Sequence, residues 1–81
     1  MHSDINVGEI RVIRTMFGSN LFVGRIVETH HSYCRVKGLT NIRNDAYQFT
    51  NRLINNGELL NIPLEYIGRI VSEEEAMAIA L

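Results

Sequence analysis

The chain has 81 residues, of which 46% are hydrophobic, and a formal net charge of −1. This length suits one domain with a single core and excludes two, and the lack of any run of about 18 apolar residues excludes a transmembrane helix. The only cysteine, Cys34, excludes an internal disulfide, and with one cysteine and three histidines we expect no metal site.

The first elements predicted along the chain are two strands joined by a turn. Residues 9–17 interleave β-branched side chains with arginine, residues 18–20 have turn chemistry, and residues 21–28 resume strand-forming types. Both faces of the second strand carry apolar side chains. This pattern predicts strong curvature of the sheet or a subunit contact.

A third strand is predicted after the short polar connection at residues 29–32. Residues 33–37 alternate, with Cys34 and Val36 facing inward. Gly38 is expected to end the regular part or to mark a bend. The Asn-rich segment that follows fits no single period, and it predicts an extended loop or arm over residues 39–57.

The last elements are predicted to be two strands and a helix. Residues 58–64 and 66–71 have strand composition with a bend between them, and Pro63, which has no N–H to donate, places its strand at an edge or interrupts it. Ser72 begins a capping box, and the acidic first turn suits the helix dipole. We expect a single domain over residues 1–81, with an N-terminal tail at 1–8 and a C-terminal helix at 72–81.

No sequence pattern indicates an enzyme. The G-x-S-x-G, Walker, H-E-x-x-H and dinucleotide-binding motifs are absent. His30 and His31 are adjacent and lack a partner at ligand spacing, while Cys34 has no local base and reads as a small buried hydrophobe. We therefore expect no catalytic residue, no cofactor, no metal and no small-molecule substrate.

The composition also predicts assembly and location. A core in a chain of about 80 residues rarely supplies more than roughly 3 to 5 kcal/mol of stability, so burial between subunits is the remaining source, and we expect a homo-oligomer. An unpaired cysteine is typical of a reducing compartment, and residues 1–4 lack the features of a signal peptide. These observations predict a soluble cytoplasmic protein without membrane contact.

The basic residues are concentrated in the middle of the chain. Residues 11–52 carry seven basic and two acidic side chains, a net charge of +5, and the flanking segments compensate. Aromatic and arginine side chains interleave in and after this region, a composition typical of surfaces that stack bases and bind phosphate: Tyr33, Tyr47, Phe49 and Tyr66 with Arg35, Arg43 and Arg52. Solvated strand faces, salt bridges between subunits and aromatic interface anchors account for the same pattern.

The order of elements resembles the Sm-like family. Residues 12–37, V-I-R-T-M-F-G-S-N-L-F-V-G-R-I-V-E-T-H-H-S-Y-C-R-V-K, resemble its first motif, with Gly24 at the fixed glycine, and the bacterial host-factor members have a similar layout. Residues 58–71 resemble the second motif in shape. The resemblance implies a mainly β fold: a strongly bent, five-stranded antiparallel barrel of the Sm-like or SH3-like type. Family members form rings by pairing the fourth strand with the fifth strand of the next subunit, and most bind single-stranded RNA.

The first hypothesis is therefore a homo-oligomeric ring of roughly five to eight subunits that binds single-stranded RNA and has a non-catalytic role in RNA metabolism or regulation. The expected nucleic-acid contacts lie in the pore loop, the third strand and the following segment: His30, His31, Tyr33, Arg35, Lys37, Arg43 and Arg52. The expected subunit interface lies in the last two strands: Ile62, Leu64, Tyr66, Ile67 and Ile70.

The second hypothesis is a ring or small-barrel scaffold that contacts proteins and binds no nucleic acid. The near-neutral net charge favours it. So do changes at the family's RNA pocket, where His30 replaces the loop acid and Tyr33-Cys34 replaces the Met-Asn pair. Its docking element is expected to be the Asn-rich segment or the C-terminal helix.

Overall fold

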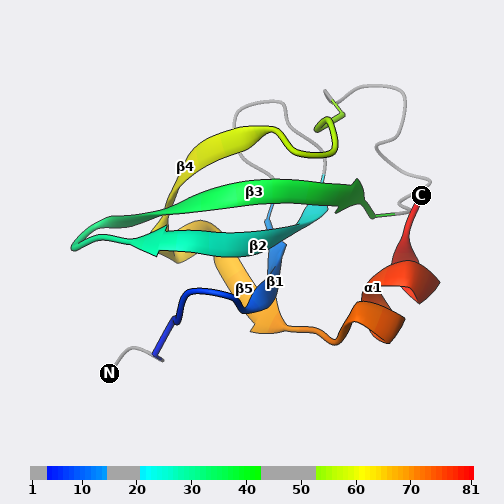
Figure 1. The fold of residues 1–81 in the computed structure, drawn as a ribbon, viewed down its shortest axis with the longest axis horizontal. Helices are drawn as coiled ribbons and strands as arrows, with labels where there is room; N and C mark the ends of the chain where they lie inside the picture. The colour runs from blue at the N-terminus through cyan, green and yellow to red at the C-terminus, as the bar shows by residue number, and fades with distance from the viewer. Residues whose placement is uncertain (1–3, 15–20, 43–52) are drawn as a thin grey trace.

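The computed structural model describes residues 4–14, 21–42 and 53–81, and these ranges form a mainly β fold with one helix near the C-terminus (Figure 1). The predicted fold class is therefore confirmed. In chain order the elements are β1 (Ile10–Ile13), β2 (Phe22–Thr29), β3 (Tyr33–Asn41), β4 (Leu59–Pro63), the 3₁₀-helix η1 (Leu64–Tyr66), β5 (Ile67–Ile70) and α1 (Glu73–Ile79). None of the helices in the described ranges is long and apolar enough to cross a membrane.

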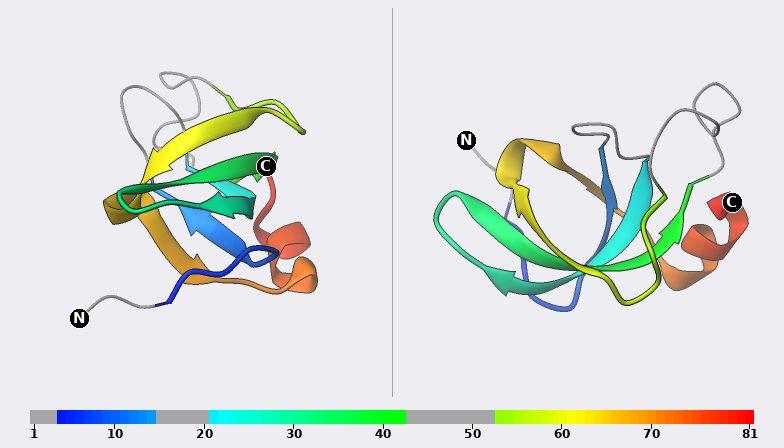
Figure 2. Two further views of the ribbon diagram at one scale, coloured as in Figure 1. Left: turned by 60° about the vertical axis from the view of Figure 1, so that its left-hand side comes forward. Right: turned by 90° about the horizontal axis from the view of Figure 1, so that it is seen from above.

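The five strands form one antiparallel sheet in the order β4-β3-β2-β1-β5. The sheet is strongly bent, as expected for a small barrel (Figure 2). It is not closed, because β4 and β5 stand at opposite ends of the strand order. Pro63 is the last residue of β4, so the missing N–H falls at the end of an edge strand, as its position in the sequence predicts.

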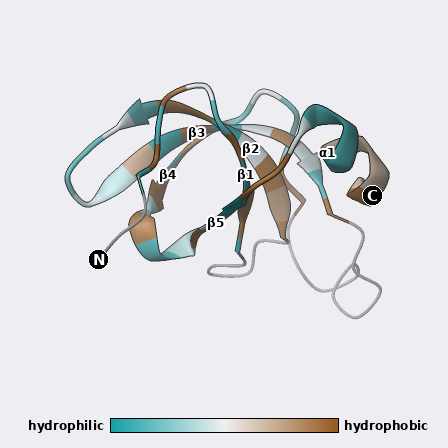
Figure 3. Ribbon diagram, turned by 90° about the horizontal axis from the view of Figure 1, so that it is seen from below, coloured by the Kyte–Doolittle hydropathy of each residue, from teal (hydrophilic) through white to brown (hydrophobic). Residues whose placement is uncertain are grey.

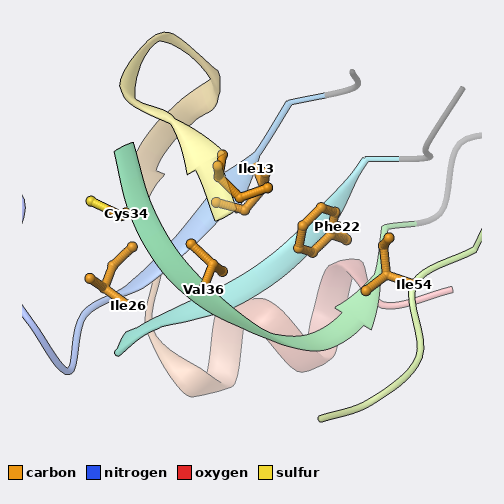
Figure 4. Close-up of a cluster of buried hydrophobic side chains, with 7 residues drawn as sticks. Ile13, Phe22, Ile26, Cys34, Val36 and Ile54 are labelled. Atoms are coloured by element: carbon orange, nitrogen blue, oxygen red, sulfur yellow. The ribbon is translucent and has the colours of Figure 1, made fainter. Parts of the chain in front are cut away.

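The main core fills the concave side of the bent sheet. Cys34 and Val36 both face it, at 1% and 0% exposure, as the alternation in β3 predicts. The labelled side chains of this core converge from β1, β2, β3 and the segment before β4 (Figure 4). The full cluster of buried residues is Ile13, Phe22, Ile26, Cys34, Val36, Ile54 and Ile62.

A second, smaller cluster explains why β2 is apolar on both faces. Val23 of β2, with 0% exposure, packs with Ile10, Val71 and Ala76. Ala76 belongs to α1, which lies at the opposite end of the β2–β3 hairpin from its turn (Figures 2 and 3). The second apolar face of β2 is therefore buried by the helix of the same chain.

The structure corrects the expected end of the third strand, because β3 runs through Gly38 to Asn41. The Gly38 N–H donates to the Glu58 carbonyl at 2.7 Å, so the ladder continues. Glycine is needed there for space, since an added Cβ would lie 2.6 Å from Ile54 Cγ2. Residues 39–41 of the predicted loop are thus strand, while residues 43–52 lie outside the described ranges.

The two termini also differ in detail from the predictions. The Gly8 N–H donates to the Ile26 carbonyl at 2.8 Å, so the predicted tail is bonded to the sheet from this residue onward. At the other end, Ser72 Oγ accepts a hydrogen bond from the Glu75 N–H at 3.0 Å, which confirms the cap. The Glu75 side chain pairs with Arg69 at 2.6 Å instead of reaching back. The helix covers residues 73–79 of the predicted 72–81.

Candidate functional site

Three of the predicted contact residues lie on one open face of β3. Tyr33, Arg35 and Lys37 occur at every second position, and alternate residues of a strand point to the same side. Arg35 and Lys37 are exposed, and within the described part of the chain neither forms an ion pair or a side-chain hydrogen bond. The face therefore presents two cations and a half-buried aromatic ring.

The turn between β2 and β3 adds a preformed aromatic pair to this face. The His30 and Tyr33 rings stack with their centroids 4.5 Å apart and an interplanar angle of 15°. The His30 N–H donates to the Tyr33 carbonyl at 2.9 Å, and His30 Nε2 lies 2.8 Å from Glu28 Oε1. The rings are therefore held in place from both sides of the turn. His31 is exposed beside them.

A β-bulge brings Glu28 to this surface. Ile26 pairs with Val36, but Glu28 pairs with Arg35, so Val27 is an extra residue on β2. Without it, Glu28 would face the core together with Ile26. Strict alternation along residues 22–28 would place the Glu28 carboxylate in the apolar core. A buried, unpaired carboxylate is unfavourable, so this sequence pattern could have indicated the bulge.

Arg25 belongs to the same basic surface and is not among the residues predicted from sequence. It stands opposite Lys37 across β2 and β3. Like charges directly opposite each other repel. The Arg25 guanidinium is held by the Gly8 carbonyl at 2.9 Å and by Glu73 at 3.4 Å.

Arg11 is buried, so it cannot contribute to a recognition surface. At 5% exposure it donates to the Gly68 and Asp4 carbonyls and pairs with Glu9 at 2.8 Å. The pKa of the Glu9 carboxyl is lowered, first by the hydrogen bond from the Asn6 backbone N–H and then by Arg11. This network fastens the chain before β1 to β5.

The remaining predicted site residues divide into three groups. Arg43 and Arg52 lie outside the described ranges. Of the expected interface residues, Ile62 is a correction: at 1% exposure its side chain fills the core, because it faces inward from β4. Leu64, Tyr66 and Ile67 are half-buried against the core, and Ile70 is 54% exposed.

On the outer edge of β4, some backbone groups have no partner among residues 4–14, 21–42 and 53–81. The Gly38 N–H donates to Glu58, and the Leu64 N–H donates to Ser32 at 3.3 Å, which fixes the phase of the ladder between β3 and β4. By the alternation of antiparallel ladders, the N–H and C=O of Asn61 point away from β3. β5 is the other end of the same sheet.

The described residues contain no cluster of three or more metal-ligating side chains. Burial raises the pKa of the Cys34 thiol, which disfavours the thiolate form that a nucleophile requires.

The sequence matches no family model and no curated protein. Among solved structures, the fold is similar to that of kinase-associated protein B from Bacillus cereus, with a TM-score of 0.63 and 21% identity. The superposition covers 95% of this chain and 71% of that one. At this level of identity the similarity shows the fold alone.

Proposed function

We propose that the protein binds single-stranded RNA on the outer face of the β2–β3 hairpin. The observation that carries the proposal is the row of Tyr33, Arg35 and Lys37 on one open strand face, with both cations free of ion pairs among the described residues. The stacked His30 and Tyr33 rings stand at the end of this row.

The chemistry of these groups suits an unpaired strand. An aromatic ring can stack on any base, and each such contact contributes about 1–3 kcal/mol. Arg35 and Lys37 would bind successive phosphates, and Arg25 would add a third positive charge beside Lys37. None of these contacts distinguishes one base from another, so we expect weak sequence preference.

We further propose that the protein acts as a homo-oligomeric ring of roughly five to eight subunits, as in the Sm-like family that the sequence resembles. The open sheet supports this, because β4 of one subunit could pair with β5 of the next. Leu59 and Ile70, at 51% and 54% exposure, are apolar side chains on these two end strands. Ring formation would repeat the basic face and multiply weak contacts.

The test is binding of fluorescently labelled single-stranded RNA, followed by anisotropy at low and moderate salt. We expect the affinity to fall steeply with salt, because phosphate contacts release counterions. Combining Arg35→Gln with Lys37→Gln should weaken binding at least about tenfold and flatten the salt dependence. The matched control is Arg69→Gln, an exposed arginine on β5 that pairs with Glu75. Salt-independent binding, or equal loss in the control, would contradict the proposal.

A second candidate function is a protein-binding scaffold. It is favoured by exposed apolar side chains at the C-terminal end, where Met77 and Leu81 are 79% and 53% exposed. The native mass of the purified protein, with absorbance at 260 nm read on the same peak, separates the two. An oligomer with bound nucleic acid supports the first function, and a nucleic-acid-free oligomer supports the second.

A further inference from the structure

Among the described residues of the proposed RNA-binding face, Glu28 is the one acidic side chain. The bulge at Val27 turns it outward, and it stands opposite Arg35 in the register of β2 and β3. Its carboxylate nevertheless lies against His30 Nε2, at 2.8 Å, and not against Arg35. A carboxylate repels phosphate, so its position on a phosphate-binding face needs an explanation other than contact with the RNA backbone.

The hydrogen bond to His30 uses only part of the Glu28 carboxylate. The Glu28 side chain is 54% exposed, and its second oxygen, Oε2, has no hydrogen-bond partner within residues 4–14, 21–42 and 53–81. An ionised carboxylate offers about four lone-pair sites and no donor. Glu28 can therefore hold His30 in place and still accept hydrogen bonds from a ligand.

The His30 ring offers a stacking surface beside this carboxylate. Tyr33 covers one face of the ring, at a centroid distance of 4.5 Å, yet the His30 side chain is 40% exposed. The opposite face of the ring is therefore the one that can receive a base. A stacked base lies about 3.5–4 Å above the ring, and Glu28 Oε1 lies at the ring edge. The edge of such a base would come within hydrogen-bond reach of the carboxylate.

Guanine is the base whose edge suits a carboxylate. The Watson–Crick edges of unpaired RNA bases are open to side chains, and that of guanine presents two adjacent donors, N1–H and N2–H. In adenine and cytosine the amino group lies next to a ring nitrogen that accepts, and in uracil N3–H lies between two carbonyl oxygens. Two adjacent donors can bind both carboxylate oxygens, whereas an acceptor is repelled by them.

We propose that Glu28 selects guanine at one position of the bound RNA, where the base stacks on His30 and donates N1–H and N2–H to the carboxylate. The inference rests on the proposed RNA-binding function, and it adds one base-specific contact to stacking and phosphate contacts that do not distinguish bases. Arg35, opposite Glu28, would offset the negative charge and bind the adjacent phosphate. Glu28 thus both positions His30 and recognises the base.

The test compares short oligouridylates that carry a single central guanine, adenine or inosine, with plain oligouridylate as the reference. Binding is followed by fluorescence anisotropy at constant salt. We expect the guanine oligomer to bind about five- to tenfold more tightly than the adenine oligomer, because adenine also stacks but lacks the second donor. Inosine retains N1–H but has no 2-amino group, so its affinity should lie between the two.

Glu28→Gln separates base recognition from the positioning of His30. The glutamine oxygen can still accept from His30 Nε2, which keeps the stack with Tyr33, but the amide now presents an N–H to the base. This variant should bind the guanine and adenine oligomers with equal affinity. The ring NMR signals of His30 and Tyr33 check that the stack remains. Glu74→Gln removes an exposed carboxylate from α1, and as the matched control it should retain the guanine preference.

The outcomes distinguish this inference from the function on which it rests. If the wild type binds oligouridylate in a salt-dependent manner but binds guanine no better than adenine, the inference is wrong and the RNA-binding proposal stands. A guanine preference that persists in Glu28→Gln would assign recognition to another residue, and equal binding of guanine and inosine would exclude the two-donor contact. Absence of binding to every oligomer would overturn both proposals.

Discussion

Gly24 and Gly38 face each other across β2 and β3, and there is no room for a side chain at Gly24. An added Cβ would lie 2.3 Å from Val36 Cγ1 and 3.2 Å from the Lys37 carbonyl oxygen. Val36 is fully buried and cannot move aside. The space restriction, and not backbone conformation, explains glycine at this position.

We therefore expect Gly24→Ala to lower the free energy of unfolding by about 1–3 kcal/mol, because overpacking displaces the core. Urea denaturation measures this. The comparison variant is Gly57→Ala, where φ is +87° and nothing lies within 4 Å of the added Cβ, so only backbone strain of about 1 kcal/mol applies. A smaller loss for Gly24→Ala than for Gly57→Ala would contradict the packing argument.

Glu9 makes stability depend on pH through its lowered pKa. A carboxyl whose pKa is lower in the folded state than its ordinary value of 4.5 stabilises the fold above that value. This contribution decreases as the pH falls below 4.5, and it is lost once the pH passes the lowered pKa of the folded state, where Glu9 takes up a proton. The cause is the hydrogen bond from the Asn6 backbone N–H, followed by the pairing with Arg11.

Glu9→Gln should destabilise the protein by about 2 kcal/mol at pH 7, because it leaves the buried Arg11 guanidinium without a charged partner. The difference from the wild type should shrink below pH 4.5. Urea denaturation at pH 7 and near pH 3.5 tests both points. The exposed Glu74→Gln serves as the control, and a pH-independent difference for Glu9→Gln would refute the argument.

At the scale of elements, α1 is a seven-residue helix that depends on its cap and on the sheet beneath it. Isolated helices of this length are unstable in water. Ser72→Ala removes the bond to the Glu75 N–H and should cost about 1 kcal/mol. Relative to the wild type, the variant should show faster hydrogen exchange in α1 and little change in β2, which would assign the loss of stability to the helix. Ser32→Ala, in the exposed turn, should change neither quantity.

The elements were largely predictable because their local signals agree with the fold. Ser72 predicts the start of α1, and the alternation at Cys34 and Val36 predicts the inward face of β3. Of the two expectations for Gly38, the strand end is wrong, because β3 continues to Asn41, while a register shift beside Gly38 fits the expected bend. Packing against Ile54 requires a glycine at this position. Such a contact joins positions far apart in sequence, so local patterns do not contain it.

The candidate site was predictable only where it lies along one strand. The row of Tyr33, Arg35 and Lys37 follows from period-two alternation alone. Arg25 joins it only through the register of β2 against β3, which a bulge at Val27 shifts. The inward position of Ile62 was missed because the phase of β4 is set by its ladder with β3, beyond its own sequence.

At the scale of the whole molecule, ring formation would depend on pairing between the two end strands of the open sheet, β4 and β5. The outward N–H of Asn61 has no strand partner in the described ranges, and in a ring it would donate to a neighbouring subunit. Asn61→Pro removes this donor without breaking the ladder to β3. Asn61→Ala retains it.

We expect the wild type and Asn61→Ala to have the mass of an oligomer, and Asn61→Pro that of a monomer. Light scattering on a sizing column measures the mass, and circular dichroism checks that each variant is folded. A monomeric wild type, or a proline variant with unchanged mass, would rule out ring formation through this edge.

The pairing of β1 with β5 has a consequence for how the chain acquires its structure. Arg11 bonds to Gly68, 57 residues later, so β1 and β5 can pair only after the whole intervening segment has been synthesised. Distant pairings of this kind slow folding, whereas the β2–β3 hairpin, joined by a tight turn, forms from local contacts. The proposed RNA-binding face therefore lies on the part of the molecule that can form earliest during synthesis. The pairing of β1 with β5 can form only later, after residues 67–70 have been synthesised.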